Sequence, residues 1–106
     1  MRRKNHKILA KPWEYRIIKF NYCCESEDWT EHTVEIWLKK RDELHKLRFI
    51  GPSQLQIEEG FPISTAGMEI IDVSEEQMEN ISIFVSDFEA SHGKITFYAK
   101  DVEEIK

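Results

Sequence analysis

Cysteine is scarce in this chain, which has only Cys23 and Cys24 among its 106 residues. Adjacent cysteines rarely form a disulfide because the bond would strain the peptide between them, so both are expected to be thiols of a reducing compartment. In a strand they would face opposite sides, one in the core and one on the surface. A zinc site needs about four Cys and His ligands at defined spacings, which the scattered histidines do not supply. We therefore expect no metal and no cofactor.

Glycine is also rare, and four residues leave little material for a glycine-rich phosphate-binding loop. The sequence has neither the Gly-x-Ser-x-Gly nor the His-Glu-x-x-His pattern of common enzyme classes. No apolar run approaches the ~20 residues that span a bilayer, and the N-terminal residues lack the apolar centre of a secretory signal. These absences predict a non-catalytic, cytoplasmic protein without membrane contact, although an enzyme whose cleft the sequence does not reveal stays a further alternative.

What the chain does contain is enough apolar material for one folded domain. Hydrophobic residues make up 41% and aromatic residues 11% of the sequence, which excludes a largely disordered chain. The net charge of -5 is unevenly spread, with seven Lys/Arg against one acid in residues 1–20 and three against twelve acids in residues 51–106. This distribution predicts a flexible basic arm over residues 1–11 and a single acidic domain over residues 12–106.

The hydrophobic pattern has a period of two, which is typical of strands. Val34, Ile36 and Leu38 alternate with polar residues, and a one-residue slip after Ile17 indicates a β-bulge or a strand buried on both faces. Ser74, with Gln77 three residues later, predicts a capping box and one helical turn. The sequence predicts a mainly β fold, an antiparallel sandwich or partly closed barrel of about seven strands with at most one short helical turn.

The clearest expected hairpin joins residues 81–86 to residues 94–99. Placing Ser86 opposite Lys94 pairs the residues of one face, Val85 with Ile95, Ile83 with Phe97 and Ile81 with Ala99, and assigns them to the core. On the other face the same register sets the rings of Phe84 and Tyr98 diagonal to each other. Trp37 lies similarly on the polar side of its own strand. These three rings either contact a second element or form a binding surface.

An acidic segment follows the first long strand and contains an aromatic residue. Its candidate partner-binding residues are Glu27, Asp28, Trp29 and Glu31, to which we add Trp37, Phe84 and Tyr98 from the mixed strand faces. Aromatic anchors with charged rims suit protein interfaces. The spacing does not match a calcium loop, so the alternatives are a solvated loop and a contact with a basic partner.

A second pattern suggests nucleic acid. Trp13, Arg16 and Lys19 interleave aromatic rings with basic side chains, as in barrels that bind single strands. The acidic residues after position 51 would repel phosphate unless the two charges segregate in space. The alternative interpretation places the rings in the core and the basic residues on the outer face of the strand.

The stretch Leu47-Arg48-Phe49-Ile50-Gly51-Pro52-Ser53-Gln54-Leu55-Gln56-Ile57, with Phe61 and Ile95-Thr96-Phe97-Tyr98-Ala99, resembles small all-β bacterial domains, some of which are immunity proteins against polymorphic toxins. This resemblance implies a β-domain that inhibits a toxin by binding it, and it carries over no functional residue. We expect a protein-binding domain whose partner has a basic surface, with single-stranded nucleic acid as the alternative ligand. Charged residues near the C-terminal strand oppose strand addition, which favours a monomer over a dimer.

Overall fold

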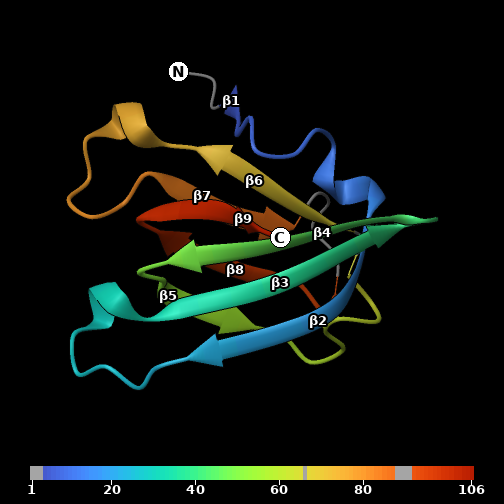
Figure 1. Ribbon diagram of the computed structural model, residues 1–106, viewed down its shortest axis with the longest axis horizontal. Coiled ribbons are helices and arrows are strands. Elements are labelled where there is room, and N and C mark those ends of the chain that lie inside the picture. Colours follow the sequence, from blue (N-terminus) through green and yellow to red (C-terminus); the bar gives the residue numbers. More distant parts are fainter. Residues whose placement is uncertain (1–3, 66, 88–91) are drawn as a thin grey trace.

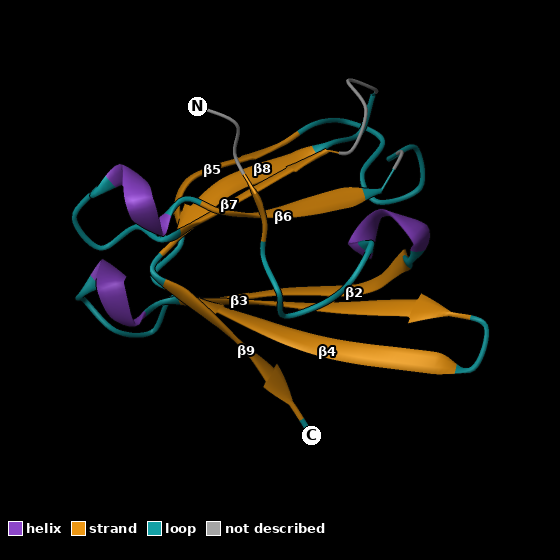
Figure 2. Ribbon diagram, turned by 90° about the horizontal axis from the view of Figure 1, so that it is seen from above, coloured by secondary structure: helices purple, strands orange, loops and turns teal. Residues whose placement is uncertain are grey.

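The computed structural model describes residues 4–65, 67–87 and 92–106, and these form two antiparallel sheets packed face to face (Figures 1 and 2). One sheet has five strands in the order β1 (Lys4–Asn5), β6 (Met68–Asp72), β7 (Ile83–Asp87), β8 (Ile95–Ala99) and β5 (Ser53–Ile57). The other has four, β2 (Arg16–Cys23), β3 (Thr33–Lys40), β4 (Glu43–Ile50) and β9 (Asp101–Ile105). The predicted mainly β class is confirmed, and the architecture is a sandwich rather than a closed barrel.

The helical content consists of three short 3-10 turns, η1 (Pro12–Glu14), η2 (Trp29–Glu31) and η3 (Ser74–Glu76), in the part of the chain that the structure describes. At most one helical turn was expected, so the prediction was too low; the expected turn is present as η3, but its capping box does not form. Ser74 is the first residue of the turn rather than its N-cap, and Asp72 Oδ1 accepts the Ser74 N–H at 2.9 Å and the Ser74 hydroxyl at 2.6 Å. No helix among the described residues is long and apolar enough to cross a membrane.

The core lies between the two sheets and consists of the alternate residues that period two predicts. On β3 the inward residues Val34, Ile36 and Leu38 have no exposed surface, while their neighbours are partly exposed. At the centre, Phe49 of the four-stranded sheet meets Phe97 of the five-stranded sheet edge to face, with ring centroids 5.1 Å apart. Burying apolar side chains from both sheets in one layer is what holds the sandwich together.

The slip in the pattern of the first long strand is a β-bulge. The register of β2 against β3 shifts between Ile17 and Lys19, and Ile18 is 41% exposed. Of the two alternatives, the bulge is confirmed, because β2 is buried on one face only.

The final hairpin has its predicted core face but not its predicted register. Ile83 pairs with Ala99 and Val85 with Phe97, a shift of two residues from the expected pairs, and Ile81 lies before the strand begins. A shift of two keeps every side chain on its face, so alternation alone cannot detect it. Residues 88–91 of the connection between the two strands lie outside the described residues.

The segment expected as a separate arm is attached to the domain where it is described. Lys4 and Asn5 pair with Asp72 and Ile71 of β6, and Leu9 is buried in the core. The prediction of a separate arm rested on the basic charge of this segment. Its short apolar stretch, Ile8 and Leu9, packs against the core. Residues 1–3 of the expected arm lie outside the described residues.

Candidate functional site

Two acidic segments that are far apart in the sequence lie at the same end of the sandwich. The β2–β3 connection carries η2 and the β6–β7 connection carries η3, and both turns project from the end where β2 and β6 finish (Figures 1 and 2). We call this region the acidic end; its acidic residues are Glu25, Glu27, Asp28, Glu31, Asp72, Glu75, Glu76 and Glu79. Lys4 partly offsets this charge, because its Nζ lies 3.4 Å from Glu75 Oε1 and 4.0 Å from Asp72 Oδ2.

Local hydrogen bonds hold the first of these segments in one conformation. Asp28 Oδ1 accepts the Thr30 N–H at 3.0 Å and the Thr30 hydroxyl at 2.7 Å. Ser26 Oγ donates to Glu31 Oε1 at 2.5 Å, and the Ser26 carbonyl accepts from His32 Nε2 at 2.6 Å. The hydrogen bonds from Thr30 lower the pKa of Asp28, so this carboxylate stays ionised near neutral pH. The loop is therefore preorganised and negatively charged.

Trp29 begins η2 on this loop, and 41% of its surface is exposed. Five large apolar side chains are exposed in the described ranges, Ile18, Trp29, Leu44, Ile57 and Ile63, and Trp29 is the aromatic one among them. Glu27, Asp28 and Glu31 lie on the same loop and are exposed. These four sequence-predicted residues are brought together by the structure.

The other three predicted partner-binding residues lie elsewhere. Trp37 is half-buried on the outer face of the four-stranded sheet, with the ammonium groups of Lys19 and Lys46 at 4.3 and 4.4 Å from its ring centroid. Phe84 and Tyr98 are stacked on the outer face of the five-stranded sheet, with centroids 4.7 Å apart and an interplanar angle of 28°. They pair directly rather than diagonally, because of the register shift. The predicted set therefore occupies three separate surfaces.

The residues of the nucleic-acid alternative are also divided. Trp13 and Arg16 line one pocket of about 270 Å³, which also contains Glu14 and Ile63. Lys19 is not among its lining residues and lies over Trp37 instead. Tyr15, the ring between Trp13 and Arg16, is buried. No basic groove lined by several rings is formed by these residues in the described ranges.

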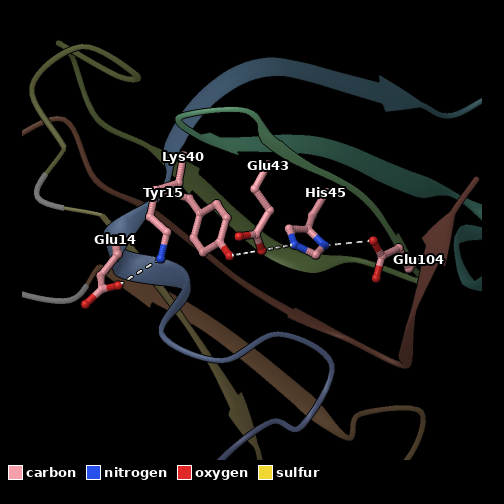
Figure 3. Close-up of polar contacts among 6 residues, drawn as sticks. All are labelled: Glu14, Tyr15, Lys40, Glu43, His45 and Glu104. Carbon is pink, nitrogen blue, oxygen red and sulfur yellow. Dashed lines mark hydrogen bonds and ion pairs between the residues drawn. The ribbon is translucent and has the colours of Figure 1, made fainter.

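A polar cluster that the sequence analysis missed lies where β4 extends past the core (Figure 3). Glu43 Oε2 accepts hydrogen bonds from the Tyr15 hydroxyl and from His45 Nε2, the latter at 2.6 Å. His45 Nδ1 lies 2.8 Å from Glu104 Oε2 on β9. Both ring nitrogens face carboxylates, an arrangement in which the protonated imidazolium donates a hydrogen bond on each side. The cluster joins β4, β9 and the residue that precedes β2.

The ionisation of this cluster follows from its contacts. Burial lowers the pKa of His45, but the hydrogen bonds and charges of Glu43 and Glu104 outweigh burial and raise it overall. The hydrogen bonds from Tyr15 and His45 lower the pKa of Glu43. The hydrogen bond to Glu43, with burial and nearby carboxylates, raises the pKa of Tyr15 to about 12. All three shifts favour the protonation states in which these hydrogen bonds form.

The arrangement of the cluster suits a structural connection rather than catalysis. Both nitrogens of His45 are engaged, so a substrate or a metal ion would have to displace a carboxylate. Within the described ranges, no group of three or more His, Cys, Asp or Glu residues is arranged to hold a metal ion. One signal in the sequence points to the cluster, because Glu43 and His45 continue the alternation of the inward residues Leu47 and Phe49.

We expect His45→Gln to lower the free energy of unfolding by about 1 kcal/mol below neutral pH, the size of a partly exposed charged contact. The folded-state pKa of His45 is raised, so its contribution is fully present below the unfolded-state value and is lost as pH rises through the folded-state value. The variant should therefore differ most from wild type in mildly acidic buffer. Urea unfolding across pH measures this, with Glu104→Gln expected to show an intermediate effect. An unchanged pH profile in His45→Gln would contradict this role.

The two cysteines are placed differently from the expectation. Both Cys23 and Cys24 are free and exposed, so neither is a core residue. The reason is that Cys23 lies on the exposed face of β2 with Lys19 and Asn21, opposite the inward side chains Phe20 and Tyr22, and Cys24 follows the end of the strand.

Comparison of the chain with family models, curated proteins and solved structures finds no match.

Proposed function

We propose that this protein is a non-catalytic binding domain whose acidic end holds a basic surface of another protein. The observation that carries the proposal is the exposed ring of Trp29 on a hydrogen-bonded acidic loop, at the same end of the sandwich as a second acidic turn from a distant part of the chain. The resemblance to immunity domains suggests a more specific form of the proposal, in which the partner is a bacterial toxin with a basic surface.

The chemistry of the acidic end supports this proposal in two ways. Carboxylates grouped on one end attract a basic partner over a distance of about one Debye length, which raises the rate of encounter. Trp29 then supplies an apolar anchor, the residue type that most often dominates the energy of an interface. Because the loop is already held by Asp28 and Ser26, little conformational entropy is lost on binding.

The nucleic-acid alternative has less support. The pocket that contains Trp13 and Arg16 also contains Glu14, whose carboxylate repels phosphate. Trp37 is flanked by lysines from both neighbouring strands, so these ammonium groups already occupy positions over its ring. We therefore retain the protein-binding proposal.

Trp29→Ala is expected to weaken partner binding by at least about tenfold while leaving the fold intact, because the ring is an exposed anchor rather than a core residue. The measurement is quantitative affinity capture from the native cells with wild type and variant as bait. A second bait carries Glu27→Gln, Asp28→Asn and Glu31→Gln, which remove charge but keep the hydrogen-bond acceptors. It should lose the same partner.

The matched control for this capture experiment is Ile57→Ala, which removes an apolar side chain of similar exposure, 45%, from the edge strand β5. It should retain the partner at the wild-type level. Equal capture by wild type and both acidic-end variants, at every salt concentration used, would overturn the proposal.

A further inference from the structure

The outer face of the five-stranded sheet carries a groove that the proposed function does not use. It has a volume of about 350 Å³ and lies over β5, β8 and β7, which are neighbours in the sheet (Figure 1). Its wall-forming side chains are Gln54 and Gln56 of β5, Thr96 and Tyr98 of β8, and Phe84 and Ser86 of β7. The groove is thus lined by rings, amides and hydroxyls.

The stacking of Phe84 and Tyr98 determines which ring surface the groove presents. Phe84 covers Tyr98 from the β7 side, with centroids 4.7 Å apart. Tyr98 lines the groove together with Gln54 and Gln56 of the neighbouring strand β5. The face of Tyr98 that Phe84 does not cover is therefore the ring surface that a ligand in the groove could contact.

A bulge in β5 sets those glutamines on the same side. Ser53 pairs with Tyr98 and Gln56 with Thr96, so Gln54 and Leu55 together oppose one residue of β8. Gln54 has a φ of 54°, a left-handed conformation that non-glycine residues adopt at an energetic cost. The extra residue lets Gln54 and Gln56 both line the groove while Leu55 packs toward the core. Bulges commonly re-aim side chains at functional positions in this way.

The charge of the groove indicates a neutral ligand. Lys94 is the charged residue among its described lining, and its Nζ lies 4.0 Å from Glu58 Oε2. Amide and hydroxyl side chains both donate and accept hydrogen bonds, which suits a ligand rich in hydroxyl groups.

We propose that this groove binds a neutral oligosaccharide, with one sugar ring packed by its C–H face on Tyr98 and its hydroxyls hydrogen-bonded to Gln54 and Gln56. A sugar ring has an apolar face and a polar rim, and these match the aromatic rings and the amide groups of the lining. A peptide added as a strand along β5 is disfavoured, because the bulge interrupts the edge that it would pair with. A polynucleotide is disfavoured because the described lining supplies one cationic side chain, Lys94, and the Glu58 carboxylate lies 4.0 Å from it.

The test is a titration of the isotope-labelled full chain with cellotetraose, maltotetraose and chitotetraose, followed by amide chemical shifts. At least one probe should give saturable shifts confined to β5, β7 and β8. Tyr98→Ala should weaken that binding by at least about tenfold, and Gln56→Ala by a smaller factor. Tyr98→Phe, which keeps the ring, should bind within about threefold of wild type.

The spectrum of each variant reports whether it is folded, so a failure of Tyr98→Ala to fold is recognised directly, and Gln56→Ala then decides the result. No saturable shift with any of the three sugars at millimolar concentration would overturn the proposal. So would tighter binding of a short extended peptide or of oligothymidylate at the same amides. Since the groove is separate from Trp29, none of these outcomes affects the proposed protein partner.

Discussion

Replacing Gly67 with alanine is expected to lower the free energy of unfolding by more than about 3 kcal/mol, a large share of the stability of a domain of this size. A Cβ atom built on Gly67 lies 2.8 Å from Trp13 Cα and closer still to the Trp13 carbonyl oxygen. These are backbone atoms of η1, which the buried residues Pro12 and Tyr15 hold against the domain. Gly67 also has a φ of 106°, which side-chain-bearing residues rarely adopt.

Urea unfolding followed by circular dichroism measures this loss, and Gly60→Ala is the matched control. Gly60 has a similar φ of 101°, but the nearest atoms to its added Cβ are Cβ and Oγ of the exposed Ser64, both at 3.2 Å, and a shift of that residue by a few tenths of an ångström relieves the contact. The control should therefore show only the conformational cost of about 1–2 kcal/mol. Equal losses in the two variants would show that the approach of Gly67 to η1 is not what makes the glycine necessary.

Phe97→Ala is expected to destabilise the protein by about 3–5 kcal/mol, as for other buried phenylalanines. Phe97 has no exposed surface and meets Phe49 across the two sheets, so its removal opens a cavity at the centre of the sandwich. The neighbouring core side chains are already closely packed between the two sheets, so they can fill only part of this space.

The same unfolding measurement tests this prediction, with Phe84→Ala as control. Phe84 lies on the neighbouring strand of the same sheet, but on its half-buried outer face, and should cost about 1 kcal/mol for the lost stacking with Tyr98. A loss in Phe97→Ala no larger than that of Phe84→Ala would contradict the assignment of Phe97 to the central core.

The fold class and the core faces could be predicted from the sequence because alternation reports directly which side of a strand is buried. Val34, Ile36 and Leu38 illustrate this, and so does the bulge after Ile17. The register of β7 against β8 could not be predicted, since shifts of two residues leave the alternation unchanged. The attachment of residues 4–9 was missed because Ile8 and Leu9 are too few to show a period.

The candidate site was only partly predictable for a different reason. The acidic loop around Trp29 is contiguous in the sequence, so its composition could be read directly. The second acidic turn, η3, lies at the same end of the sandwich only because of how the two sheets are arranged. No local sequence pattern indicates that arrangement. Likewise, His45 and Glu104 are 59 residues apart and meet because β4 pairs with β9.

The central claim, that the acidic end contacts a basic protein through Trp29, is tested most directly by photo-crosslinking in the native cells. A benzophenone amino acid is placed at position 29 in one variant and at position 57, a similarly exposed site on β5, in another. We predict a specific crosslinked partner from position 29, mapped to a Lys/Arg-rich segment and lost when Glu27, Asp28 and Glu31 are neutralised. A partner that crosslinks equally from position 57, or survives that neutralisation, would contradict the claim.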